Sequence, residues 1–154
     1  MALWVDKYRP HSFDKMELHT GLNTRLKRLA ESGDLPHLMF CGPSGAGKKT
    51  RILALLRELY GVSAEKVKAQ QKVFNFTEPK ATVELTILSS ANHIELTPAD
   101  AGSRDSLVVQ SVIKEIAASV PITDNISGKR TFRIIVLNEV DRLSRNAQHA
   151  LVSV

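Results

Sequence analysis

The stretch "CGPSGAGKKT", residues 41–50, constrains the fold of this chain more than any other segment. From Gly42 to Lys48 it has the spacing G-x-x-x-x-G-K, and it lies between an apolar run, "HLMFC", and an amphipathic segment. Glycines let a backbone curl so that successive N–H groups point at phosphate oxygens, and a helix starting there adds its positive dipole end. The stretch therefore predicts a phosphate-binding loop between a buried strand and a helix. A glycine-rich turn without a ligand is the alternative, which the flanking segments disfavour.

The position after Lys48 departs from the usual pattern of such loops. Loops of this kind carry a Ser or Thr there, whose hydroxyl binds Mg²⁺, whereas this chain has Lys49. Thr50 cannot replace that hydroxyl, because one step along a helix turns the side chain by about 100°. Lys49 could instead add positive charge near the phosphates. The predicted nucleotide-binding residues of the loop are Gly42, Pro43, Ser44, Gly45, Ala46, Gly47, Lys48, Lys49 and Thr50.

A second segment, "FRIIVLNEVD" at residues 132–141, is an apolar run that ends in polar residues. In phosphate-loop hydrolases an Asp at such a strand end helps to hold Mg²⁺, and an adjacent Glu orients water. Here Asn138 stands at the Asp position, so it is a degenerate metal-site position, and Glu139 is the candidate catalytic residue. A core strand that simply ends in polar residues remains an alternative. Because Lys49 and Asn138 both remove metal ligands, we expect binding of ATP or ADP, weak or absent Mg²⁺, and poor hydrolysis.

The remaining periodicities predict an α/β fold with a mainly parallel sheet, because strands and helices alternate outside one hairpin. In the first part of the chain, the expected elements are an irregular lead-in over 1–12, a helix with Leu22, Leu26 and Leu29 that ends near Gly33, a strand over 37–41 and a helix from 48 to Gly61. A hairpin of "KVFNF" and "TVELTIL" and a strand in "NHIELTP" are expected next. The last expected elements are a helix over 105–119, a polar loop over 121–130, a strand over 132–141 and a helix from Ser144.

Length and composition set broad limits on function. The 154 residues fit one domain, and a net charge of +5 suits an acidic partner such as nucleotide, nucleic acid or acidic protein. The single cysteine, Cys41, excludes an internal disulfide, suits a reducing compartment, and is expected to be a packed thiol. No apolar run is as long as a membrane span, so we expect no membrane partner.

Four separated segments in order carry a resemblance to a known family: "LWVDKYRP", "PHLMFCGPSGAGKKTRI", "ELTPADAG" and "VLNEVDRLSRNAQHAL". Together they resemble the small subunits of replication factor C, the eukaryotic AAA+ complex that loads the sliding clamp onto primed DNA, most closely in its plant form. The resemblance implies an AAA+ P-loop NTPase domain of the ASCE type with an inserted β-hairpin. It also implies a nuclear protein whose partners are the other subunits of a hetero-pentamer, the sliding clamp and primed double-stranded DNA.

The family resemblance assigns a role to the lead-in. In clamp loaders this segment folds over the adenine, which makes Val5, Tyr8, Arg9 and Pro10 neighbours of the base and ribose. A hydrophobic anchor for the N-terminus is the alternative for Trp4 and Val5.

Three further positions gain a role from the same resemblance. Gln148 matches a glutamine that couples the nucleotide site to the DNA-facing helices. Arg104 and Arg145 stand at the starts of two predicted helices, where they suit contacts to the DNA backbone. Solvated surface arginines are an equally good interpretation of these two residues.

The chain departs from the family after "AQHAL", where the family continues "L-R-R-T-M-E" and this sequence reads "LVSV". The expected domain, residues 1–154, is therefore incomplete, with the sensor strand, the lid and the collar missing. We expect such a chain to be marginally stable and unable to assemble. Two other functions remain open: a fragment that binds only the clamp or a nucleotide, and a free-standing P-loop phosphotransferase. The second would need a hydroxyl after Lys48 and an arginine-rich lid.

Overall fold

A computed structural model describes residues 2–78, 80–118 and 132–152. The chain divides into two compact units, Met1–Lys66 and Val67–Val154. The predicted loop over 121–130 lies outside the described residues. None of the described helices is long and apolar enough to cross a membrane.

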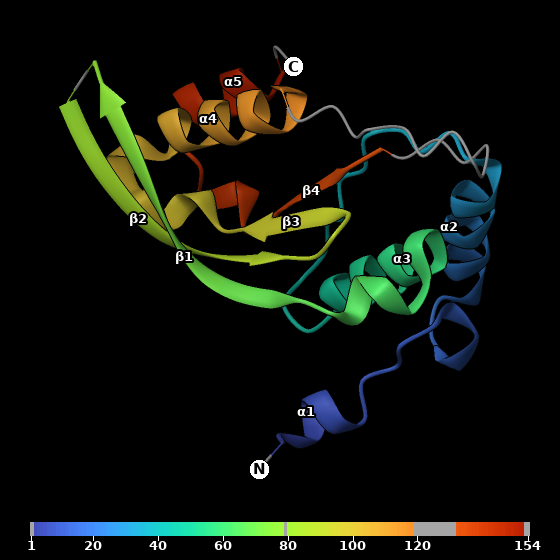
Figure 1. The fold of residues 1–154 in the computed structure, drawn as a ribbon. Helices are drawn as coiled ribbons and strands as arrows, with labels where there is room; N and C mark the ends of the chain where they lie inside the picture. Colours follow the sequence, from blue (N-terminus) through green and yellow to red (C-terminus); the bar gives the residue numbers. More distant parts are fainter. Residues whose placement is uncertain (1, 79, 119–131, 153–154) are drawn as a thin grey trace. The chain divides into compact units, whose positions relative to one another are not determined.

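The first unit is helical in its described part. Its elements are α1 (Trp4–Lys7), η1 (Phe13–Lys15), α2 (Thr20–Ser32), α3 (Lys48–Tyr60) and η2 (Gly61–Glu65) (Figure 1). The helices α2 and α3 pack around one small core, made of Phe13, Met16, Leu26, Ala54 and Leu55. Each of these two helices ends at a glycine with positive φ, Gly33 (71°) and Gly61 (69°), as the sequence predicts.

Two predictions for the first unit are wrong. The lead-in is not wholly irregular, because the Leu3 carbonyl accepts hydrogen bonds from Asp6 and Lys7 and closes the turn α1. The run over 37–41 is not a buried strand, since Met39 is 77% exposed and the Cys41 thiol is exposed, not packed. An apolar segment becomes a strand only when a neighbouring strand pairs with its backbone, and no described strand pairs with this one.

The second unit contains the sheet, in the order β1-β2-β3-β4 (Figure 1). Its strands are β1 (Lys68–Thr77), β2 (Lys80–Ser89), β3 (His93–Leu96) and β4 (Ile134–Leu137), and its helices are η3 (Pro98–Arg104), α4 (Asp105–Ala118), η4 (Val140–Arg142) and α5 (Arg145–Val152). The predicted hairpin, the later strands and the last two helices are all present, and β1 and β2 are longer than the sequence indicates. In contrast, β4 is shorter than the strand predicted over 132–141, because η4 begins at Val140. The predicted helix end at residue 119 lies outside the described residues.

The prediction of a mainly parallel sheet is wrong for the described strands. The pairs β1–β2 and β2–β3 are antiparallel, and β3–β4 is the parallel pair. The hairpin joins the edge of the sheet through the pairing of Leu88 with Glu95, so it adds antiparallel neighbours instead of standing apart. The pattern of strands and helices in the sequence does not reveal where a hairpin attaches.

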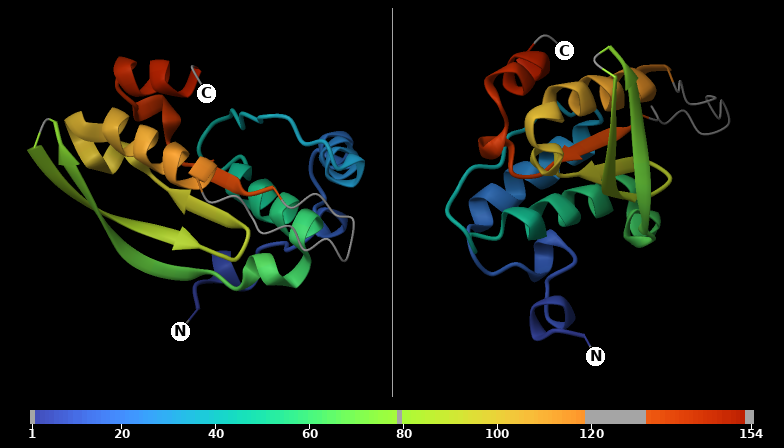
Figure 2. Two further views of the ribbon diagram at one scale, coloured as in Figure 1. Left: turned by 45° about the horizontal axis from the view of Figure 1, so that its top comes forward. Right: turned by 90° about the vertical axis from the view of Figure 1, so that its left-hand side faces the viewer.

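One face of this sheet is covered by α4, and α5 lies beside α4 (Figures 1 and 2). Alternate side chains of β2 are buried, as expected for a strand with one covered face. They meet α4 in a core cluster whose buried members are Phe74, Val83, Leu85, Ile87, Leu96, Val108 and Val112. This packing places the ends of β3 and β4 next to the short helices that follow them.

Candidate functional site

The glycine-rich loop of the first unit has the backbone that an anion cradle needs. Gly45 and Gly47 have φ of 78° and 83°, a region that residues with a side chain rarely adopt. The Ala46 N–H donates to the Pro43 carbonyl (3.2 Å), which closes a turn before α3 begins. The Lys48 ammonium donates to the Gly42 carbonyl (2.5 Å), so it lies across the same loop.

Several N–H groups of the loop lack a backbone partner. Between residues 42 and 50, the described backbone hydrogen bonds outside helices are donated by Ala46 alone. The N–H groups of Gly45, Gly47 and Lys48 are therefore available to an anion at the start of α3. Lys49, the second residue of α3, is exposed beside them.

The lead-in of the first unit contacts the start of α3 through one hydrogen bond. The Arg9 guanidinium donates to the Thr50 hydroxyl at 2.8 Å, and it also lies 3.7 Å from the Asp6 carboxylate. A cavity of about 270 Å³ is lined by Trp4, Val5, Tyr8, Arg9, Pro10 and Thr50. The structure thus brings together the four predicted base neighbours and one predicted loop residue. The Thr50 hydroxyl accepts this bond and therefore faces Arg9.

Two buried polar residues of this region, Arg51 and Asn23, are missing from the sequence prediction. Arg51 is 7% exposed and Asn23 is 4% exposed. Arg51 stands three and four residues before the buried Ala54 and Leu55, so helical periodicity places it on the buried face of α3. A charged residue in that register is the sequence signal that could have identified it.

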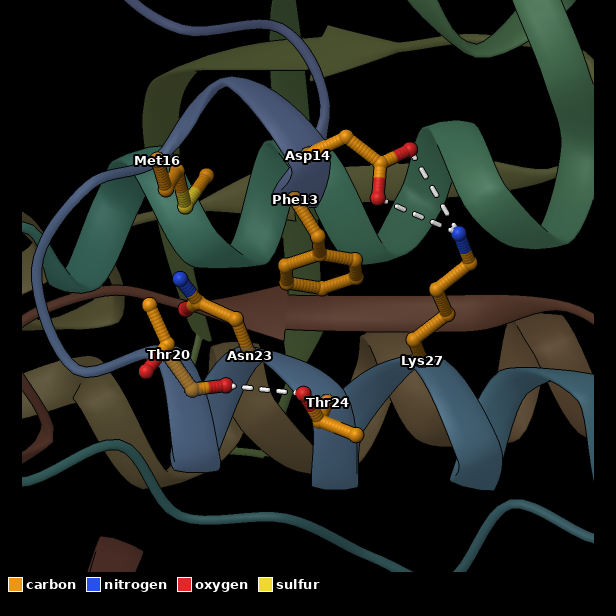
Figure 3. Close-up of a pocket in the computed structure, with 7 residues that line it drawn as sticks. All are labelled: Phe13, Asp14, Met16, Thr20, Asn23, Thr24 and Lys27. Atoms are coloured by element: carbon orange, nitrogen blue, oxygen red, sulfur yellow. Dashed lines mark hydrogen bonds and ion pairs between the residues drawn. The ribbon is translucent and has the colours of Figure 1, made fainter.

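A second depression of the first unit, about 210 Å³, contains none of the predicted site residues (Figure 3). It is lined by Phe13, Asp14, Met16, Thr20, Asn23, Thr24 and Lys27. The Lys27 ammonium lies 3.3 Å from the Asp14 carboxylate, and this contact raises the pKa of Lys27. The Asn23 side chain points from α2 toward the segment that carries Phe13 and Met16 (Figure 3).

In the second unit, the two predicted residues after β4 are both held by neighbours. The Asn138 amide donates to the Glu95 carboxylate at 2.9 Å, and the Asn138 N–H donates to the Leu96 carbonyl at 3.0 Å. Glu139 has a φ of 53°, which is uncommon for a residue with a side chain, and its carboxylate pairs with Arg142. The described residues contain no group of three or more side chains that could hold a metal ion by themselves.

The starts of α4 and α5 are joined by one buried carboxylate, that of Asp105 (2% exposed). It accepts hydrogen bonds from the Ser144 N–H (2.6 Å), the Ser144 hydroxyl (2.7 Å) and the Ser106 N–H (2.7 Å). Burial raises the pKa of Asp105, but these hydrogen bonds outweigh burial and lower it below the ordinary value. Arg104 and Arg145 are the chain neighbours of the two joined residues, so both DNA-contact candidates flank this joint.

Gln148, the predicted coupling residue, is an exposed residue of α5. Its side-chain amide donates to the Leu143 carbonyl at 3.0 Å, just before the helix starts. This contact is local to α5, so the coupling role stays a prediction.

The chain is similar in sequence to several known proteins. The chain is 53% identical to "Replication factor C subunit 3" of Arabidopsis thaliana over 151 residues, and 44% identical to the protein of that name from Homo sapiens. A protein named "Probable replication factor C subunit 3" from Dictyostelium discoideum is 51% identical. The stretch of sequence that these matches cover belongs to the replication factor C subunit family. No family model matches the chain.

The match to these replication factor C subunits has a clear extent. It covers 97% of the chain for the Arabidopsis protein, so it includes the lead-in, the glycine loop and the end of β4. The chain spans about two fifths of the length of these curated relatives (42%). What the whole relatives do is therefore a matter of proposal for this chain.

Proposed function

We propose that this chain is the nucleotide-binding part of a replication factor C subunit, which binds ATP or ADP and hydrolyses it poorly. In this proposal it acts in the nucleus with the other subunits of a hetero-pentamer, the sliding clamp and primed double-stranded DNA. It contributes nucleotide sensing to clamp loading and leaves most hydrolysis to neighbouring subunits. The family relationship supports membership of the hetero-pentamer, and the contacts within the first unit support nucleotide binding.

The contact between Arg9 and Thr50 is the observation that carries nucleotide binding. Through this 2.8 Å hydrogen bond, the predicted base-side segment and the predicted phosphate loop meet in one compact unit. The exposed rings of Trp4 and Tyr8 line the same cavity and could stack on a base. At the other end, unpaired N–H groups and Lys48 fit the charge and geometry of phosphates.

Poor hydrolysis is supported by the surroundings of the candidate catalytic residue. Glu139 is paired with Arg142, and it would have to give up that contact to act as a base on water. Asn138 gives an amide where a carboxylate is expected, and its Nδ2 group is already bound to Glu95. Lys49 offers an ammonium where a metal-binding hydroxyl is expected. Magnesium is therefore a weak cofactor here, and nucleotide binding depends mainly on the protein's own cations.

Contact with the DNA backbone is supported by the joint between α4 and α5. Arg104 and Arg145 stand at the starts of two helices that Asp105 and Ser144 hold together. Two arginines beside these helix starts suit contacts to phosphate groups. Charge reversal at Arg145 would weaken DNA-stimulated activity of the assembled complex, whereas an unchanged response would remove this residue from the proposal.

Calorimetric titration of the chain with ADP tests the nucleotide proposal directly. We expect saturable binding in EDTA, and a gain of less than about threefold when Mg²⁺ is added, because the metal ligands are depleted. Absence of binding in both conditions would refute the proposal.

Hydrolysis is tested in a pentamer reconstituted with a longer subunit that contains this sequence, in which this site is the sole intact nucleotide site. We expect metal-dependent turnover far below that of an ordinary site. The double variant Lys49→Thr with Asn138→Asp restores both metal-ligand types and should increase the effect of Mg²⁺. Turnover at an ordinary rate in the unmodified subunit would contradict the weak-hydrolysis proposal while leaving nucleotide binding intact.

A further inference from the structure

A buried guanidinium lies directly against the phosphate loop. The Nη1 group of Arg51 donates to the Ala46 carbonyl at 3.1 Å and to the Gly47 carbonyl at 3.4 Å. A Cβ atom on Gly47 would lie 2.8 Å from the same nitrogen, so a side chain there would collide with Arg51. The loop backbone and this side chain are therefore packed in contact.

All described partners of this guanidinium are uncharged. Its Nε group donates to the Asn23 Oδ1 atom at 3.1 Å, and its Nη2 group donates to the Leu18 carbonyl at 3.0 Å. With the two loop carbonyls, these contacts use four of the five N–H groups of the guanidinium but leave its positive charge uncompensated. A buried charge without a counter-ion is costly, unless an anion binds close to it.

The contacts of Arg51 also fix the direction of the loop's N–H groups. In a trans peptide unit the C=O and the following N–H point in opposite directions. Because Arg51 holds the carbonyls of Ala46 and Gly47, the N–H groups of Gly47 and Lys48 point away from Arg51. Within the described ranges those N–H groups have no backbone partner, so their orientation suits an anion on the open side of the loop.

We propose that Arg51 is a positioning residue for the phosphates of a nucleoside diphosphate or triphosphate, and that its charge replaces part of the magnesium ion. The inference rests on the proposed nucleotide binding and deepens it. Arg51 orients the cradle through the two carbonyls, and its uncompensated charge attracts the phosphates through the loop. It touches no reacting atom in this proposal, because the backbone of the loop lies between it and the anion.

A purely structural role is the competing interpretation, and the variant Asn23→Asp separates the two. Asp has nearly the shape of Asn, so it would still accept from the Arg51 Nε group, now as a carboxylate. It would also replace the 3.2 Å bond that Asn23 donates to the Leu18 carbonyl with a repulsion between two oxygens, so the folding of the variant is checked by circular dichroism. The change therefore neutralises the charge of Arg51 while leaving the guanidinium in place.

The experiment measures displacement of a fluorescent ADP analogue by ADP and by adenosine, in EDTA, with the full chain. For Asn23→Asp we expect ADP affinity to fall on the order of tenfold and adenosine affinity to stay within about twofold. Arg51→Met should lower the preference for ADP at least as much, and Arg51→Lys should restore part of it because the charge returns. The matched control is Arg57→Met. It removes a different cation of α3, one that is paired with Glu65 of η2, and should leave both affinities unchanged.

The outcomes distinguish this inference from the nucleotide proposal. If Asn23→Asp, shown to be folded by circular dichroism, keeps the wild-type ratio of adenosine to ADP dissociation constants, the role of Arg51 is refuted and nucleotide binding stands. If the wild-type chain binds neither ligand, both proposals fall. Should Arg51→Met fail to fold, Asn23→Asp decides the question alone, because it keeps the guanidinium and its carbonyl contacts.

Discussion

The two compact units bury charges of opposite sign by the same chemical means. In the first unit, the buried cation Arg51 is surrounded by amide and carbonyl oxygens. In the second unit, the buried carboxylate of Asp105 is surrounded by hydroxyl and N–H donors. Neither charge has an ion-pair partner among the described residues, so in each unit hydrogen bonds with neutral groups offset part of the cost of burial.

The difference between these charges lies in what each one holds. Asp105 joins the starts of α4 and α5, and its hydrogen bonds all serve that joint. Arg51 holds the backbone of a loop whose outer side carries unpaired N–H groups. Asp105 therefore stabilises the fold of its unit, whereas Arg51 orients the backbone of a proposed binding loop. Substitutions in the two units should accordingly separate into effects on unfolding and effects on affinity.

The largest effect is expected from Asp105→Ala in the second unit. The variant leaves the Ser144 and Ser106 donors without their acceptor in a buried place, so we expect the free energy of unfolding to fall by about 3 kcal/mol. Urea denaturation followed by circular dichroism measures it. Asp141→Ala, at an exposed position, is the control and should change stability by less than about 0.5 kcal/mol. If Asp105→Ala changed stability as little as the control does, the claim that Asp105 stabilises the second unit would be wrong.

The pH dependence of stability provides the sign of the Asp105 contribution. The pKa of Asp105 is lowered in the folded chain, so its contribution is fully present above the ordinary value of 3.8 and is lost as the pH falls through the lowered pKa. Asp105→Asn should remove this acid-dependent loss. An unfolding free energy that depends on pH in the same way in wild type and Asp105→Asn would show that the carboxylate charge is not stabilised as described.

The second effect in size concerns affinity and is expected from Lys48→Ala in the first unit. We expect ADP affinity to fall by about 30-fold, or about 2 kcal/mol, because the charge that reaches the phosphates is removed. The Gly42 carbonyl that loses its bond is exposed, so stability should change little. Calorimetry measures the affinity, and Lys66→Ala is an exposed control. Equal ADP affinity in both variants would remove Lys48 from the site.

The sequence predicts the local elements of both units better than it predicts their buried charges. The helix ends at Gly33 and Gly61, the hairpin of β1 and β2, and the helix α4 each follow from local sequence patterns. The run over 37–41 is predicted wrongly, because an apolar pattern does not specify whether a strand partner is present. The roles of Arg51 and Asp105 depend on neighbours far apart in sequence, such as Asn23 and Ser144, which no local pattern connects.

The next effect in size tests whether the second unit also excludes positive charge from its interior. Burial lowers the pKa of His93, against an opposing effect of Glu95. Its Nδ1 atom contacts the Ser90 hydroxyl, and its buried Nε2 atom has no hydrogen-bond partner in the described part of the chain. The neutral ring should therefore stabilise the fold above the ordinary value of 6.5, and stability should decline as the pH falls below it through the lowered pKa.

The variant His93→Leu should flatten this decline. One proton limits the slope to about 1.4 kcal/mol per pH unit, so the effect is smaller than that of Asp105→Ala. Thermal unfolding from pH 7.5 downward, in steps of about 0.5 pH unit, measures the decline. The control is His37→Leu, at an exposed position in the first unit. A decline that persists in His93→Leu would assign the acid sensitivity to another group.

The smallest effect is expected from Thr50→Val, which tests whether the two ends of the first unit's site act separately. Valine keeps the shape of threonine but cannot accept the 2.8 Å hydrogen bond from Arg9, so the base-side segment loses one tie to α3. We expect ADP and adenosine affinities to fall together by about threefold, since a single net hydrogen bond contributes about 1 kcal/mol or less. Displacement titration with both ligands measures the two affinities. A loss confined to ADP would mean that Thr50 acts on the phosphates, so that the base-side contact and the Arg51-supported cradle form one unit instead of two separable parts.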